Sequence, residues 1–149
     1  MSGEMTPATR VLVVAHRTAA TPRLLDEIRA RARRSRCTFT LLVPRPYWDP
    51  DTDEAAATLE LALPLLEAAA GGHVEGIVGD SDPLAAVQRT VEAGGFDEII
   101  ISTLPVRVSR WLRRDLPHRV ESLGVPVTVV TAQQLERAAY DESSSLLHG

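Results

Sequence analysis

The sequence predicts an α/β domain in which a five-stranded, mostly parallel sheet is sandwiched by helices. Short apolar runs rich in β-branched residues, such as those at 11–15 and 99–101, are too short for helices and are typical of buried strands. Longer segments with apolar residues at helical spacing lie between them, as at 23–34. This regular alternation favours parallel strands joined by crossover helices.

Turn residues and capping residues set the boundaries of each element. Pro64 lies inside the second helix and is expected to kink or split it. Ser81 or Asp82 should cap the third helix, and Asp115 is the expected N-cap of the fourth. The expected strands cover 11–15, 38–43, 73–78, 99–103 and 127–130, and the expected helices cover 23–34, 52–70, 83–93 and 115–124.

The length of 149 residues is that of one ordinary domain. We expect a flexible leader at 1–9, a single α/β domain at 10–132 and a C-terminal tail at 133–149. The net charge of −4 argues against nonspecific nucleic-acid binding. No apolar run approaches the length of a membrane span, and the first residues do not resemble a signal peptide. The cytoplasm is therefore the expected location.

One βαβ unit, at 96–131, is where we expect any chemistry. Its first strand ends in the hydroxyl residues Ser102 and Thr103, and Pro105 cannot continue a sheet ladder. Ligands of such sheets bind beyond the carboxyl ends of the strands. The loop at 102–114 is therefore the predicted site.

At these residues the chain resembles the universal stress protein (UspA-like) fold, a nucleotide-binding α/β domain, over residues 10–131. In ATP-binding members the loop after the fourth strand carries a Gly-x2-Gly-x9-Gly-Ser/Thr pattern that wraps the phosphates. Ser102 and Pro105 stand where the first two glycines would be, and Arg114-Asp115 stands where the last Gly-Ser/Thr would be. The resemblance implies the strand order 3-2-1-4-5. The altered loop implies weak or absent ATP binding.

The resemblance also places the turn after the first strand across a crevice from the loop after the fourth. His16 takes roughly the place of an aspartate that contacts the nucleotide in family members. Hydroxyls, arginines and backbone N–H groups in these loops suit an anion such as phosphate. The alternative is a crevice filled by its own side chains, including Trp111. The expected ligand-binding residues are His16, Arg17, Thr18, Ser102, Thr103, Ser109, Arg110, Arg114, Asp115 and His118.

Neither a Gly-x-Ser-x-Gly nucleophile motif nor a cysteine with a matching histidine is present in the sequence. A proton-transfer role for His118 would need Ser102 or Asp115 beside it. The histidines lack metal-ligand spacing, so no metal is expected. No cofactor is expected beyond a weakly bound nucleotide such as ATP.

The last predicted strand carries Val127, Val129 and Val130 and is expected at the sheet edge. An exposed β-branched edge is a template for pairing, and many universal stress proteins dimerise through this strand. A homodimer paired there about a two-fold axis is expected. The alternative is that the tail after Ala132 covers the edge.

The expected function is that of a UspA-like stress-response module that binds an anionic small molecule or a protein partner. The alternative is a nucleotide-handling enzyme of the adenine-nucleotide α-hydrolase-like group, using Ser102, Arg114 and His118 around a phosphate. A protein-interaction module without a ligand is the third possibility.

Overall fold

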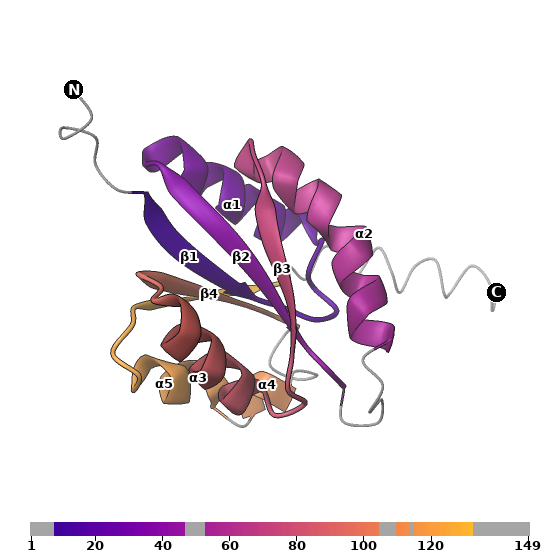
Figure 1. Cartoon of the computed structure of the whole chain (residues 1–149), viewed down its shortest axis with the longest axis vertical. Helices are drawn as coiled ribbons and strands as arrows, with labels where there is room; N and C mark the ends of the chain where they lie inside the picture. Colours follow the sequence, from indigo (N-terminus) through magenta and orange to yellow (C-terminus); the bar gives the residue numbers. More distant parts are fainter. Residues whose placement is uncertain (1–7, 47–52, 105–109, 114, 133–149) are drawn as a thin grey trace.

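The computed structural model describes residues 8–46, 53–104, 110–113 and 115–132 (Figure 1). Five parallel strands form one sheet in the order β3-β2-β1-β4-β5, which confirms the expected fold class and strand order. The strands are β1 (Thr9–Val14), β2 (Cys37–Pro44), β3 (Val74–Gly79), β4 (Glu98–Thr103) and β5 (Val127–Thr131). The helices are α1 (Pro22–Arg34), α2 (Asp53–Ala70), α3 (Pro83–Gly94), α4 (Arg110–Arg113) and α5 (Leu116–Glu121).

Helices cover both faces of the sheet (Figure 1). On one face, Val11 and Val13 of β1 join a core that includes the buried side chains of α1 and α2. On the other face, Leu12 and Val14 join a second core, which contains buried residues of α3 and α5. Because β1 is paired on both edges and covered on both faces, every residue from Val11 to Ala15 is fully buried.

The Arg31 side chain links α1 to β4 and β5. Its guanidinium contacts the carboxylate of Glu98 at the start of β4 and donates to Thr128 Oγ1 of β5 at 3.0 Å. It also pairs with Glu27, one helical turn earlier, at 3.3 Å. Because the Arg31 side chain is only 13% exposed, these partners offset the cost of removing its charge from water.

Most of the predicted boundaries are confirmed to within two residues. Each strand and each of the first three helices begins and ends close to its expected position. Asp82 is confirmed as the cap of α3, where its Oδ1 accepts a hydrogen bond from the Leu84 N–H at 3.1 Å. α2 runs as one helix through Pro64 and is not split. Pro64 is exposed, so the Glu60 carbonyl that it leaves without an N–H partner is on the hydrated side.

The predicted fourth helix differs from the observed structure in two ways. The short helix α4 precedes it, and α5 itself ends at Glu121. Asp115 is the N-cap residue of α5, as predicted, and its carbonyl accepts the first intrahelical hydrogen bond, from the Arg119 N–H, at 3.1 Å. Its side chain makes no capping hydrogen bond, because Asp115 has left-handed backbone angles (φ 58°, ψ 38°) instead of the extended geometry from which an N-cap side chain reaches back to the helix.

Three predictions concern segments outside the described residues: most of the leader, the tail at 133–149 and the loop at 105–109. Within the described ranges, no helix is both long enough and apolar enough to span a membrane. β5 lies at the sheet edge, as expected, with Val129 exposed and Val130 buried.

A methyl group added at Gly79 should destabilise the fold, because the carboxyl end of β3 is tightly packed. A Cβ at Gly79 would lie 2.7 Å from Leu42 Cδ1 and 2.9 Å from Ala86 Cβ. We expect Gly79→Ala to lower the free energy of unfolding by about 1–3 kcal/mol in urea denaturation. Gly72→Ala is the control, since a Cβ there meets nothing within 4 Å and should change stability by less than about 1 kcal/mol. Equal effects of the two substitutions would contradict the packing argument.

Candidate functional site

The candidate site lies where the carboxyl ends of β1 and β4 meet. β1 pairs with β2 on one edge and with β4 on the other. The chain leaves these two neighbouring strands in opposite directions, which makes this the topological switch point of the sheet. The turn at 15–21 follows β1, and the loop that begins at Leu104 follows β4.

A hydrogen bond between two side chains joins the two sides of this switch point. Thr18 Oγ1 and Ser102 Oγ lie 2.7 Å apart, and the two residues are 2% and 1% exposed. Ser102 Oγ also lies 3.4 Å from the Thr18 carbonyl oxygen. Each buried hydroxyl is thus satisfied by the other segment, which holds the turn after β1 against the end of β4. Thr103 is also buried, and its Oγ1 lies 3.5 Å from Thr131 Oγ1 of β5.

His16 is the unsatisfied group of the site. Its Nε2 atom is buried and has no hydrogen-bond partner in the part of the chain that the structure describes. The carboxylate of Glu54, in the first turn of α2, lies near it, with Oε1 at 3.9 Å from Nε2. Burial lowers the pKa of His16; Glu54 opposes this shift and the guanidinium of Arg17 adds to it. A neutral imidazole can donate or accept a hydrogen bond, so this nitrogen can meet a polar group of a ligand.

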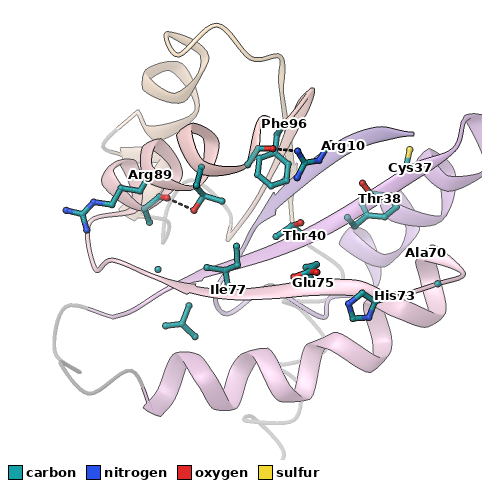
Figure 2. A pocket seen from close by; sticks show the side chains of 18 of the residues that line it. Arg10, Cys37, Thr38, Thr40, Ala70, His73, Glu75, Ile77, Arg89 and Phe96 are labelled. Carbon is teal, nitrogen blue, oxygen red and sulfur yellow. Dashed lines mark hydrogen bonds between the residues drawn. The ribbon is translucent and has the colours of Figure 1, made fainter. Parts of the chain in front are cut away.

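A hollow of about 1000 Å³ lies away from the switch point, across β2 and β3 on the face that carries α3 (Figure 2). Thr40, Glu75 and Ile77 lie along its floor, and Arg10 and Arg89 lie on its α3 side (Figure 2). Both arginines have partners within the protein. Arg10 donates to the Gly94 carbonyl and stacks on the Phe96 ring at 5.0 Å, and Arg89 pairs with Asp80 at 3.2 Å. The polar floor suits a part of the sheet that faces water rather than a helix.

No protein-family model and no curated protein matches the sequence. Similar solved structures include a universal stress protein in complex with cAMP, with 17% identity and a TM-score of 0.59, covering 86% of this chain and 100% of that chain. They also include a universal stress protein from Archaeoglobus fulgidus, with 16% identity and a TM-score of 0.60, covering 87% and 96%. The chain has the universal stress protein fold.

A third structure with this fold is the universal stress protein from Archaeoglobus fulgidus in complex with dAMP. It shares 20% identity with the chain at a TM-score of 0.59 and covers 85% of this chain and 99% of that chain. The three matches span nearly the whole of each stress protein, so the described domain corresponds to their complete fold.

Within the universal stress protein fold, the predicted site residues fall into three groups. Thr18, Ser102 and Thr103 are buried at the carboxyl ends of β1 and β4 or in the adjoining turn, together with the half-buried His16. The exposed Arg17 follows His16, while Asp115 and His118 are exposed at α5. The remaining residues are Ser109 and Arg114, which lie outside the described residues, and Arg110, whose backbone begins α4.

Sequence analysis missed two features of the site region. Glu54 was not expected beside His16, since the approach depends on how α2 packs after an intervening loop. The hollow over β2 and β3 was also missed. The sequence feature that could have predicted this hollow is the position of three polar residues on one face of otherwise apolar strands: Thr38, Thr40 and Glu75.

Removal of the Ser102 hydroxyl should destabilise the domain because it leaves the buried Thr18 hydroxyl without its partner. We expect Ser102→Ala to lower the free energy of unfolding by about 1–3 kcal/mol in urea denaturation. The pair Thr18→Val with Ser102→Ala should cost less than the sum of the two single changes. Ser122→Ala is the control, since the hydroxyl of this exposed serine donates to the nearby Arg119 carbonyl and its loss should cost less than about 0.5 kcal/mol. Additive effects of Thr18→Val and Ser102→Ala would contradict a direct bond.

The lowered pKa of His16 should make the fold less stable in acid. Below about pH 6.5 the imidazole of His16 is protonated in the unfolded chain, whereas its lowered pKa disfavours protonation in the folded chain. The unfolded state therefore binds more protons in this range. Stability is therefore retained near pH 7 and falls as the pH drops towards about 5. Urea denaturation across this range should show a smaller loss for His16→Ala than for the unsubstituted protein. His118→Ala, which removes an exposed imidazole, should lose as much stability in acid as the unsubstituted protein. If His118→Ala reduced this loss as much as His16→Ala does, the assignment to His16 would be wrong.

Proposed function

We propose that this chain is a non-enzymatic stress-response module that binds a nucleotide or a similar anionic small molecule at the switch point between β1 and β4. The observation that carries the proposal is the buried Nε2 of His16, which has no hydrogen-bond partner among the described residues. A buried polar atom without a partner is costly, and a ligand that supplies one recovers that cost. The exposed guanidinium of Arg17 beside it favours an anionic ligand.

The fold neighbours support this class of ligand. Two of the similar universal stress proteins are complexes with adenine nucleotides that carry a single phosphate, cAMP and dAMP. The proposal therefore favours a mononucleotide over ATP. Ser102 replaces the first glycine of the ATP-binding pattern, and its side chain is buried against Thr18, which supports weak or absent ATP binding. We place the module in the cytoplasm.

The site chemistry favours binding over turnover. The Ser102 hydroxyl is engaged by Thr18, and His118 is exposed on α5, whereas Ser102 is 1% exposed. A hydroxyl nucleophile needs a base within hydrogen-bond reach, and the two hydrogen bonds that Ser102 makes among the described residues both go to Thr18.

A homodimer through the last strand is also part of the proposal. β5 is an edge strand, and Val129 on it is 40% exposed, so its unpaired edge can accept a second copy. Val130 faces the interior and Val127 packs on the second core, so Val129 and the backbone would supply most of this contact.

The ligand proposal predicts a thermal shift that depends on His16. A ligand at about 100 times its dissociation constant should add about 2.7 kcal/mol to the stability of the folded state. We expect AMP and cAMP to raise the melting temperature more than ATP does at the same concentration, and inorganic phosphate to have little effect. His16→Ala should remove the AMP shift, while the exposed and distant His73→Ala should retain it.

Three results of that titration would contradict the proposal. An equal shift with every anion would assign binding to the arginines alone. A shift that survives His16→Ala would place the ligand elsewhere. No shift with any nucleotide at millimolar concentration would favour a protein-interaction module.

A further inference from the structure

α2 presents an apolar surface to solvent. Leu61 is 77% exposed and Leu65 is 48% exposed, one turn apart on this helix. Helical periodicity of 3.6 residues places three further exposed residues on the same face. The resulting surface, called the α2 stripe here, consists of Ala57, Leu61, Pro64, Leu65 and Ala68.

The opposite face of α2 is apolar as well. Ala55, Ala62, Leu66 and Ala69 are buried against the sheet and α1. A helix that is apolar on both faces is typical of one that is buried on both sides, and the residues that the structure describes cover only one side of α2. Exposed leucines that adjoin other apolar residues on a rigid helix mark an interaction surface.

Charged residues flank the α2 stripe unequally. Glu60 and Glu67 lie on one flank, and Glu67 accepts a hydrogen bond from the Val74 N–H of β3 at 3.1 Å. This flank therefore faces the outer edge of the sheet, away from α1. α2 carries no arginine, whereas the exposed face of neighbouring α1 includes Arg33 and also Arg29, which pairs with the exposed Asp26 at 2.8 Å. The stripe thus has an acidic flank on one side and a basic helix on the other.

We propose that the α2 stripe binds the α2 stripe of a second copy of this chain. The five residues of the stripe are all apolar, so the stripe can pair with itself about a two-fold axis, and the exposed Glu54, seven residues before Leu61, marks the end of this apolar surface. Charge selects the direction of that axis. If the axis runs parallel to the two helices, α1 of one copy lies over the acidic flank of α2 in the other copy. If the axis runs across the helices, α1 meets α1, and the arginines repel one another.

The area of the α2 stripe determines how strongly two copies of the chain should associate. α2 has 18 residues and is about 27 Å long, and together with α1 it offers a face about 20 Å wide. The footprint of roughly 500 Å² is below the ~800 Å² per partner of a standard stable interface. The contact should therefore form at high protein concentration and dissociate on dilution.

This contact is separate from both parts of the proposed function. α2 packs over β2 and β3, whereas β5 lies at the opposite edge of the sheet (Figure 1). Both surfaces can be occupied together, and the two two-fold contacts would then build a larger assembly.

Sedimentation velocity of the full chain from about 1 to about 300 µM tests this contact. The average mass should rise with concentration, and Leu61→Glu should weaken that association by about tenfold or more because it places a charge in the apolar centre. Ile77→Glu is the matched control, since Ile77 is 37% exposed on β3 and lies outside the stripe. Val129→Glu removes any pairing at the β5 edge without touching α2. Melting temperatures of all variants establish that each one is folded.

Three results would overturn the proposal. The first is a protein that stays monomeric at every concentration, which would indicate that the α2 stripe binds a different protein and not a second copy. The second is an association that Leu61→Glu leaves unchanged while Val129→Glu abolishes it. The third is a stripe-dependent association that strengthens as salt rises from about 0.05 to about 0.5 M, because screening should weaken the contact between α1 and the acidic flank.

Discussion

The burial of β1 is the constraint on which the rest of the structure depends. Its run from Val11 to Ala15 has no exposed residue, so it is stable only with a strand on each edge and helices on each face. α1 and α2 meet that requirement on one face, and α3 and α5 meet it on the other. With β2 and β4 on its two edges, β1 also sets the position of the switch point. The candidate site is therefore a consequence of how the most apolar strand is buried.

The chain passes from this core into the site within a few residues, and the properties of His16 follow from that transition. A residue directly after a buried strand cannot move its side chain fully into water, so desolvation lowers the imidazole pKa. Two residues further along, Thr18 meets Ser102 and closes the core beneath the site with a hydrogen bond instead of apolar contact. Among the described residues at this end of the sheet, the Thr18 and Ser102 hydroxyls thus satisfy each other, whereas the His16 Nε2 has no hydrogen-bond partner.

The parts of the fold that could be predicted are those that local sequence determines. Apolar runs located each strand, and the Asp82-Pro83 pair located the start of α3. The strand order came from resemblance, since periodicity does not encode which strands are neighbours. Features that depend on tertiary packing could not be predicted: the approach of Glu54 to His16, the left-handed backbone of Asp115 and the uncovered polar face of β2 and β3. The exposure of Leu61 could not be predicted for the same reason. In a helix that is apolar on both faces, the sequence does not show which leucines are covered.

α2 connects the two proposals physically. Its first turn supplies Glu54 to the switch point, and its middle supplies Leu61 and Leu65 to the stripe. A helix is stiff along its axis, so any shift of α2 that accompanied contact at the stripe would also move Glu54 relative to His16. If a ligand at His16 prefers one position of Glu54, ligand binding and association through the stripe must influence each other. That coupling is reciprocal by thermodynamic necessity, so any ligand that tightens the association of two copies is itself bound more tightly by the associated form.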